Sequence, residues 1–400
     1  MYDKTFISFK INMNNIILSV IQQIDKNYVQ VESEKTFEYN SFLDDSLSII
    51  NQNLSALLKK YNKNDKKINF IFSDQLFSYK YKNQINLIQD NIKSINNQLI
   101  IEENSVLLNE NVYKYKLNFD DGWTKEYKTL PKNQNYSSAE EYKTQLYINT
   151  TNQDVKNYFI QLKNILKHFK QTKSNNYYFY LENQLLANKL SSYKGNQIMV
   201  HVLNDKILLN IIKNGIIYAE KIINIGTDLL FENSELKNID KNILYSRLNE
   251  ILDRKFHQQF INCDQINKIL ENNISKLYTA LELYIKAFIL KLVKNTKNPK
   301  IWLHSNNNNL LSYWVVSLKN KNDDFYSKCD FSSLFPYIRN EQFSLISDLD
   351  FSFQQAVLAS NNNEVDDYSH LQTVTSEFDI EKVKNKSLFT VFKSWFSLNK

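Results

Sequence analysis

Apolar and polar residues alternate along the first seventy positions in a pattern that predicts strands followed by a helix. Short apolar stretches begin at Phe6, Ile16 and Tyr28, which is the spacing of a three-stranded meander. Over residues 44–60 leucine and isoleucine recur at helical spacing, and residues 67–73 return to an apolar strand. The chain is therefore predicted to begin as three strands, a helix and a fourth strand.

A similar order of elements returns further along the chain. The predicted elements are a helix over 155–170, a strand over 177–181, strands over 198–202, 207–212 and 216–223, helices over about 244–260 and 266–293, and a strand over 300–303. Gly215 follows Lys213 and Asn214, which together indicate the second hairpin turn of this meander. Two meanders that are each followed by helices and a further strand predict a duplicated α/β fold, although periodicity alone does not separate it from other α/β folds.

The sign of the charge changes abruptly near the C-terminal end of the chain. Residues 341–381 contain nine acidic residues and no Lys or Arg, whereas residues 382–400 contain five lysines and no acid. An acidic segment rich in Asn and Ser stays extended in water, and a basic segment is attracted to anionic lipid. We therefore expect residues 346–381 to form an acidic flexible linker.

Residues 382–400 also predict an amphipathic helix. At about 100° per residue their apolar side chains cover one half of a helical wheel, and lysines line its border. The predicted membrane-binding residues are Lys386, Leu388, Phe389, Val391, Phe392, Lys393, Trp395, Phe396, Leu398 and Lys400. Such a helix is too short to span a bilayer and is typical of an interfacial anchor. The alternative is a terminal helix that packs on its own domain or on a partner protein.

Composition narrows the chemistry that the chain can carry. The net charge of only +6 does not indicate nucleic-acid binding, and two distant cysteines indicate neither a disulfide framework nor a zinc site. No signal peptide and no run of about 18 apolar residues is evident, so we expect a cytoplasmic protein that does not cross the membrane. Only 4 of the 400 residues are glycine, which disfavours functions that need glycine-rich loops.

Short motifs along the chain resemble, in their order and spacing, those of the FtsA family. The matching segments are 10–13, 119–123, 130–131, 185–195, 201–206, 223–228, 251–254 and 301–310. FtsA proteins are actin-like proteins that tie the bacterial division filament to the membrane through a C-terminal amphipathic helix. The resemblance covers roughly residues 5–345 and the tail, and each motif has lost its characteristic glycines and acids.

The resemblance implies an α/β, actin-like two-lobe fold made of duplicated ribonuclease-H-like domains. The implied parts are lobe 1 (1A) over 1–81 and 151–195, an inserted 1C-like subdomain over 82–150, the core of lobe 2 (2A) over 196–226 and 299–345, a 2B-like subdomain over 227–298, the linker over 346–381 and the membrane-binding helix over 382–400.

The family's nucleotide site depends on glycine turns, whose N–H groups approach the phosphates, and on acids that position Mg²⁺. The residues at the corresponding positions here are Lys10, Asn12, His201, Leu203, Asn204, Ser305 and Asn306. These side chains predict a vestigial cleft with no catalytic residue, no metal and no cofactor, where ATP with Mg²⁺ would bind only if the eroded cleft still functions.

The function implied by the resemblance is that of a cell-division scaffold. It would tether filaments of the tubulin-like protein FtsZ to anionic lipid on the cytoplasmic face of the membrane, at the division site, and associate with itself into polymers. The first alternative is an actin-superfamily ATPase or small-molecule kinase, which would need the phosphate loops that are absent. The second is a peripheral membrane scaffold of unrelated fold.

Overall fold

A computed structural model describes most of the chain between Lys4 and Asn362. The described residues are 4–25, 27–61, 65–89, 104–119, 125–130, 138–169, 175–190, 193, 196–213, 215–257, 259, 264–292, 299–305, 307–321, 323, 325–334 and 350–362. The predicted membrane-binding segment 382–400 and Asn306 lie outside them. Among the described helices, none is long and apolar enough to cross a membrane.

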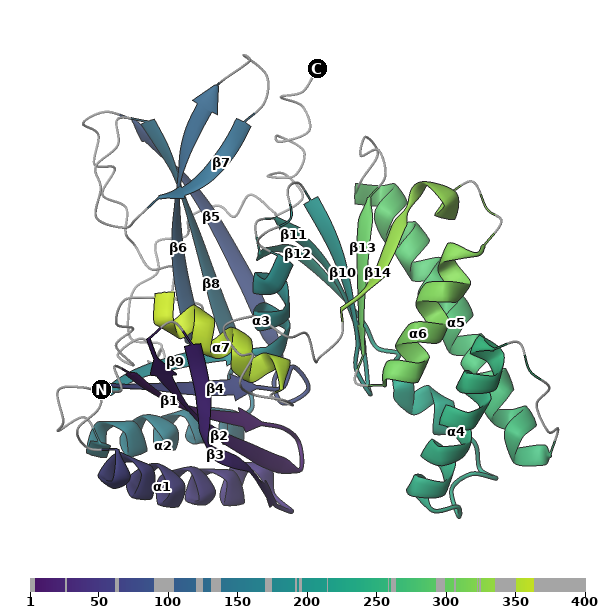
Figure 1. Cartoon of the computed structure of the whole chain (residues 1–400), viewed down its shortest axis with the longest axis horizontal. Coiled ribbons are helices and arrows are strands. Elements are labelled where there is room, and N and C mark those ends of the chain that lie inside the picture. The colour runs from purple at the N-terminus through teal and green to yellow at the C-terminus, as the bar shows by residue number, and fades with distance from the viewer. Residues whose placement is uncertain are drawn as a thin grey trace.

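The first lobe is built on a five-stranded sheet with the order β3-β2-β1-β4-β9. Its strands are β1 (Lys4–Ile11), β2 (Asn15–Ile24), β3 (Asn27–Glu38), β4 (Asp65–Phe72) and β9 (Asn175–Leu181). The first three strands pair antiparallel, as the alternation predicted, and β4 and β9 add in parallel. Helices α1 (Phe42–Lys60) and α2 (Gln153–Phe169) cover one face of this sheet (Figure 1).

The second lobe repeats this topology, with the strand order β12-β11-β10-β13-β14. Its strands are β10 (Asn196–Val202), β11 (Ile207–Lys213), β12 (Ile216–Ile223), β13 (Lys300–Ser305) and β14 (Asp330–Ser333). Again the meander is antiparallel and the last two strands are parallel. Two sheets of identical order and direction confirm the predicted actin-like two-lobe α/β fold. The alternative of an unrelated fold is therefore wrong.

Helices complete the second lobe on the outer face of its sheet (Figure 1). They are α4 (Lys241–Phe256), α5 (Gln265–Leu292) and α6 (Asn308–Lys319), with the short 3-10 helices η2 (Thr227–Phe231) and η3 (Tyr326–Lys328). One apolar core joins them to the sheet, with Trp314 and Leu248 among its buried members. Helix α6, which the periodicity did not predict, starts at Asn308 because the side chain of Asn307 caps the N–H of Leu310.

Glycine is needed at two positions of this lobe. Gly215 has a φ of 78°, which lets β11 and β12 form the predicted hairpin. Gly226 has extended backbone angles, but a Cβ there would lie 2.2 Å from the main-chain oxygen of Asn204. Gly226 therefore allows the end of β12 to lie against the loop between β10 and β11.

A separate four-stranded sheet is inserted between β4 and α2. Its order is β5-β8-β6-β7, and all its pairs are antiparallel. The strands are β5 (Tyr79–Gln89), β6 (Ser105–Phe119), β7 (Lys125–Leu130) and β8 (Ser138–Asn149). Val106, Leu108 and Ile148 join the insert to the core of the first lobe.

Two helices lie on the side of the first sheet opposite α1 and α2. Helix α3 (Glu182–Lys189) follows β9 and runs between the two lobes, and α7 (Phe351–Asn362) crosses the sheet beside it (Figure 1). Along β1, Ile7 and Phe9 face α1 and α2, whereas Phe6 faces α7 together with Phe353 and Val357.

The expected flexible linker over 346–381 is wrong for residues 351–362. They form α7, in which Phe353, Ala356 and Val357 are completely buried. The acidic composition of this stretch predicts an extended segment, but Lys4 and Lys67 of the first lobe supply cations that hold it. Lys4 Nζ donates to Asn361 Oδ1 at 2.8 Å, and Lys67 Nζ donates to the main-chain oxygen of Ser360. Both contacts lie at the C-terminal end of α7, where a cation is favoured.

Candidate functional site

A cleft of about 390 Å³ lies between the two lobes. The first lobe contributes the β1–β2 hairpin, the start of α3 and the residues before α7, and the second lobe contributes Asn204, His304 and Asn308. Its lining residues are Lys10, Asn12, Met13, Asn14, Asn15, Ile17, Ser73, Gln75, Glu182, Leu186, Asn204, His304, Asn308, Asp350 and Ser352. Only three of them carry a full charge at pH 7: Lys10, Glu182 and Asp350.

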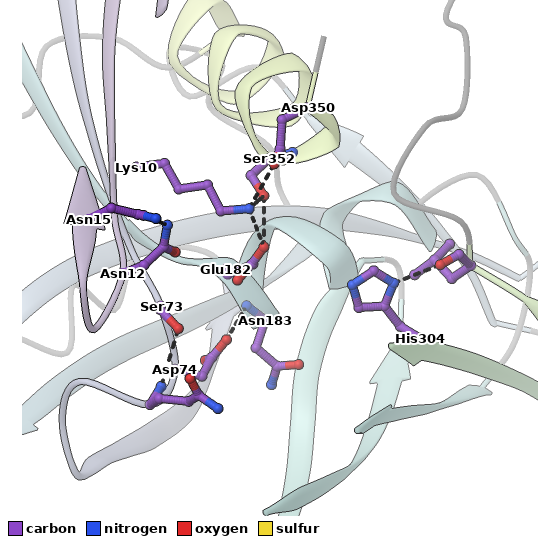
Figure 2. A network of polar contacts seen from close by, with 12 residues as sticks. Lys10, Asn12, Asn15, Ser73, Asp74, Glu182, Asn183, His304, Asp350 and Ser352 are labelled. Atoms are coloured by element: carbon purple, nitrogen blue, oxygen red, sulfur yellow. Dashed lines mark hydrogen bonds and ion pairs between the residues drawn. The ribbon is translucent and has the colours of Figure 1, made fainter. Parts of the chain in front are cut away.

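These three charged residues meet in the cleft (Figure 2). Lys10 Nζ lies 2.8 Å from Glu182 Oε1 and 2.8 Å from Asp350 Oδ2. The hydroxyl of Ser352 lies 3.3 Å from the same ammonium and donates to Glu182 Oε1 at 3.0 Å. We call Lys10, Glu182, Asp350 and Ser352 the Lys10 cluster. It joins β1, α3 and α7, which are far apart in the sequence.

Burial and charge act against each other within the Lys10 cluster. Burial alone would lower the pKa of the Lys10 ammonium, but the Glu182 and Asp350 carboxylates raise it well above its ordinary value. Burial alone would raise the pKa of the Glu182 carboxyl, but Lys10 lowers it. The ammonium and the Glu182 carboxylate are therefore both ionised at neutral pH. Glu182 also lies in the first turn of α3, where the helix dipole favours a negative charge.

The β1–β2 turn keeps a hairpin shape without glycine. Asn12 donates its main-chain N–H to the oxygen of Asn15 at 2.9 Å, and its side-chain amide donates to Asn15 Oδ1 at 2.7 Å (Figure 2). The Tyr39 hydroxyl donates to the main-chain oxygen of Asn12. Because the two amides bond to each other across the turn, side chains occupy the mouth of this hairpin.

The β10–β11 turn uses its carbonyl groups to hold the neighbouring chain. Leu203 N–H donates to the oxygen of Lys206 at 2.9 Å, and the oxygens of Leu203 and Asn204 accept from Thr227 and Asp228 at 3.0 and 2.8 Å. This arrangement depends on the close approach at Gly226. The turn is thus fixed by protein contacts on the side that faces η2.

The structure brings only some of the predicted cleft positions into the cleft. Lys10, Asn12 and Asn204 line it, and Ser305 lines a second cavity beside it. His201 and Leu203 are buried and line neither. For His201, burial and the neighbouring His304 lower the pKa far below its ordinary value, so this imidazole is neutral.

The second cavity measures about 340 Å³ and lies wholly in the second lobe. Its lining residues are Val202, Asn204, Thr227, Leu230, Phe231, Tyr245, Leu248, Asn249, Ser305, Asn307, Asn308, Asn309 and Leu310. None of these side chains is charged. Amides and one aromatic pair, Phe231 and Tyr245 with ring centroids 4.9 Å apart, dominate the wall.

The sequence analysis identified Lys10 but missed its partners. Glu182 opens a short helix that was not predicted, and Asp350 was counted only as one acid of the expected linker. Their sequence separations from Lys10 are 172 and 340 residues. No local signal connects such positions, so the cluster becomes visible only after α3 and α7 are placed on the first sheet.

Only the comparison with solved structures finds proteins that are similar to this chain. No model of a known protein family matches the sequence, and no curated protein matches it. Among solved structures, the chain is similar to a PilM–PilN type IV pilus biogenesis complex, with 7% identity, a TM-score of 0.47, and 88% of this chain and 98% of that chain covered.

Two further solved structures cover nearly the whole chain. One is a non-polymerising MamK mutant bound to AMPPNP, at 6% identity and a TM-score of 0.40, covering 90% of this chain and all of that one. The other is a protein of unknown function with an actin-like ATPase fold from Bacteroides thetaiotaomicron, at 11% identity and a TM-score of 0.37, covering 89% and 95%. Such likeness says nothing about activity. The fold itself is evident from the duplicated strand order.

Proposed function

We propose that this protein is an actin-fold scaffold that works without nucleotide hydrolysis and tethers FtsZ filaments to the cytoplasmic face of the membrane. The observation that carries the proposal is the Lys10 cluster, in which the only cation among the described residues that line the cleft is already paired with two carboxylates. The actin-like body would bind FtsZ and other copies of itself, and the C-terminal segment would bind anionic lipid.

The charge of the cleft supports a scaffold that does not use nucleotide. One ammonium faces two carboxylates there, so the charged groups of the lining sum to −1. A nucleotide triphosphate would need donors and cations at this end, together with acids free to organise Mg²⁺. Here Glu182 and Asp350 are engaged by Lys10, and a triphosphate would meet net repulsion. The groups present therefore do not fit Mg-ATP.

The two turns support the same proposal. Phosphate-binding turns present main-chain N–H groups that no side chain obstructs. In this chain the side chains of Asn12 and Asn15 close the first turn, and Leu203 N–H is used within the second. A phosphate would have to displace these contacts.

The tether itself rests on the sequence of residues 382–400. Each lysine near an anionic surface contributes about 1 kcal/mol, so a single copy would bind weakly and reversibly. Many copies along a filament would bind tightly through avidity. This supports a scaffold that polymerises or follows an FtsZ polymer.

The experiment that tests the tether is co-sedimentation of FtsZ with liposomes. The full-length chain is mixed with FtsZ and vesicles that contain about one-third anionic lipid, with and without Mg-ATP. We expect FtsZ to pellet with the vesicles equally well in both conditions. A chain lacking residues 382–400 should leave FtsZ in the supernatant, whereas neutral vesicles should reduce pelleting of the full-length chain.

Two outcomes would contradict the proposal. If the truncated chain still brings FtsZ to vesicles, the tail is not the tether. If pelleting requires Mg-ATP, the cleft is a working nucleotide site and the ATPase or kinase alternative gains support. No described feature favours that alternative at present, because the second cavity offers neutral amides without an accompanying phosphate site.

A further inference from the structure

A second polar cluster connects the two lobes through Asn183, the residue after Glu182. Figure 2 shows the contact of Asn183 with Asp74. Asn183 donates its main-chain N–H to Asp74 Oδ2 at 2.8 Å and its side-chain amide to Glu220 Oε2 at 3.1 Å. The side-chain oxygen of Asn183, Oδ1, accepts from Asn210 Nδ2 at 3.3 Å and lies 3.4 Å from His201 Nδ1. Every polar atom of this side chain is thus engaged.

Glu220 is the point at which three parts of the molecule meet. It belongs to β12 in the second lobe, whereas Asp74 and Asn183 belong to the first lobe. Tyr79, the first residue of β5 in the inserted sheet, donates its hydroxyl to Glu220 Oε2 at 3.1 Å. A change of charge on this carboxyl therefore acts on both lobes and on the insert together.

Neither Asp74 nor Glu220 has an ion-pair partner in the described part of the chain. Asp74 is completely buried, and its Oδ1 atom has no hydrogen-bond partner among the described residues. Lys206, whose charge acts on both carboxyls, donates at 2.6 Å to the main-chain oxygen of Asp74 and not to its carboxylate. Lys10 is already shared between Glu182 and Asp350.

The surrounding groups do not neutralise a negative charge at Glu220. The titratable and charged groups that face this cluster are Asp74 after β4, Tyr79 and Tyr81 of β5, Glu182 of α3, His201 of β10 and Lys206 before β11. His201 is neutral, and both tyrosines keep their protons because burial raises their pKa. Among the charges of these groups, only the positive charge of Lys206 lowers the pKa of Glu220.

Burial and like charge accordingly favour protonated carboxyls in the docked state. Burial raises the pKa of Glu220 to about 7, although the Tyr79 hydroxyl, Lys206 and Asn183 act in the opposite direction. Burial also raises the pKa of Asp74, and the Glu182 and Glu220 carboxylates raise it further. Placing charge on both groups at once would leave two uncompensated carboxylates between the lobes.

We propose that Glu220 is a proton-operated latch that keeps the two lobes and the insert docked when protonated and releases them when ionised. Glu220 is partly buried, so release would let more water reach its carboxylate between α3 and β12. This gives the cleft a way to open and close that needs no nucleotide. The inference is independent of the proposed tether.

The sign of the pH dependence follows from the raised pKa of Glu220. A carboxyl whose pKa is higher in the docked state stabilises docking fully below its ordinary pKa of 4.5, and this stabilisation is lost as the pH rises through about 7. Between these two pKa values the ratio of open to docked molecules should grow by up to about tenfold per pH unit, and above about pH 7 it should level off because the carboxyl is then ionised in both states. The change falls within the range that a cell can reach.

The test measures lobe separation in the full-length chain between pH 5.5 and 8.5, without nucleotide, FtsZ or lipid. Small-angle scattering follows the radius of gyration, and hydrogen exchange, corrected for intrinsic rates, follows the amides of β12. We expect the radius to increase and β12 to lose protection as the pH rises toward about 7, with little further change above it. Circular dichroism confirms that the chain stays folded.

Three variants separate a latch from general loosening. Glu220→Gln keeps the acceptor oxygen but cannot ionise, so it should stay docked across the range. Tyr79→Phe removes a donor that stabilises the ionised form, so the midpoint should move to higher pH. Glu232→Gln, an exposed acid of the same lobe, should retain the normal transition.

The experiment can overturn the proposed latch whether or not the C-terminal segment acts as a tether. An absent transition, or one that persists unchanged in Glu220→Gln, would overturn it. A Tyr79→Phe variant that opens more at every pH with an unchanged midpoint would show a merely structural contact and would also overturn it. None of these results bears on whether FtsZ or lipid binds.

Discussion

At the scale of single residues, Lys10 is the cation that holds two carboxylates of the cleft together. Substituting Lys10→Met removes the ammonium while keeping much of the side-chain volume, so that Glu182 and Asp350 are left as uncompensated carboxylates. Losing one partner of a buried ion pair destabilises a protein by about 3–5 kcal/mol. We expect a loss of this size in urea unfolding at pH 7. The double variant Lys10→Met with Glu182→Gln should recover part of it, because one of the stranded charges is gone.

The same cluster predicts a pH dependence. The pKa of Glu182 is lowered in the folded chain, so its stabilising effect is present above the ordinary pKa of 4.5 and is lost as the pH falls through the lowered value. In Lys10→Met that contribution should disappear, since the cation responsible for it is absent. Unfolding free energies measured between pH 3 and 7 should therefore converge for the two proteins at the acidic end. Parallel curves over the whole range would contradict the assigned role of Lys10.

Gly226 permits a third prediction at this scale. Gly226→Ala should destabilise the second lobe by about 1–3 kcal/mol, because the added Cβ would lie 2.2 Å from the main-chain oxygen of Asn204. Gly215→Asn is the matched control, since asparagine tolerates the positive φ of that turn. Urea unfolding should show a clearly larger loss for Gly226→Ala, and an equal loss in both variants would contradict the proposed crowding.

The role of a single residue could be predicted from the sequence where that role depends on its neighbours along the chain. The hairpin at Gly215 follows from its two neighbours, and the absence of glycine at Asn12 and Asn204 was visible directly. The contacts of Lys10 were not predictable, because the sequence shows a lysine without showing which residues approach it. Asp350 reaches Lys10 only because α7 crosses the first sheet.

At the scale of elements, α7 carries the clearest prediction. Phe353 is completely buried against the first sheet, so Phe353→Ala should reduce the stability by about 3–5 kcal/mol and loosen α7. Limited proteolysis should then cleave within residues 351–362 at least several times faster. Gln355→Ala, at a half-buried position of the same helix, should leave the cleavage rate nearly unchanged. Equal effects of the two substitutions would show that α7 is not held by its apolar face.

The strands and long helices were predictable because their periodicity is simple. Both meanders, α1, α2, α4 and α5 appeared near their predicted places, with ends that moved by a few residues. Helices α3 and α7 were not predicted, because each is short and neither shows a clear amphipathic pattern. Residues of α3 are buried all round, polar side chains included, since this helix lies between the lobes and not on a surface.

At the scale of the whole molecule, duplication explains how a chain with so few glycines keeps an actin-like architecture. The two sheets share one strand order, so each lobe is held by its own core and depends little on the loops at the cleft. The fold therefore tolerates changes of residue type in those loops. Topology was predictable from the order of the elements, whereas the contents of the cleft required the structure.

This separation of fold from cleft chemistry predicts that Mg-ATP leaves the thermal stability unchanged. A ligand present at 100 times its dissociation constant stabilises the folded state by about 2.7 kcal/mol, so a site with a dissociation constant near 10 µM would respond clearly to 1 mM nucleotide. We expect 1 mM Mg-ATP to shift the melting temperature by less than about 1 °C relative to Mg²⁺ alone, because the Lys10 ammonium is already held by Glu182 and Asp350. A saturable rise in melting temperature that Lys10→Met abolishes would show that Lys10 leaves its carboxylate partners to bind a phosphate. The cleft would then be a functional nucleotide site.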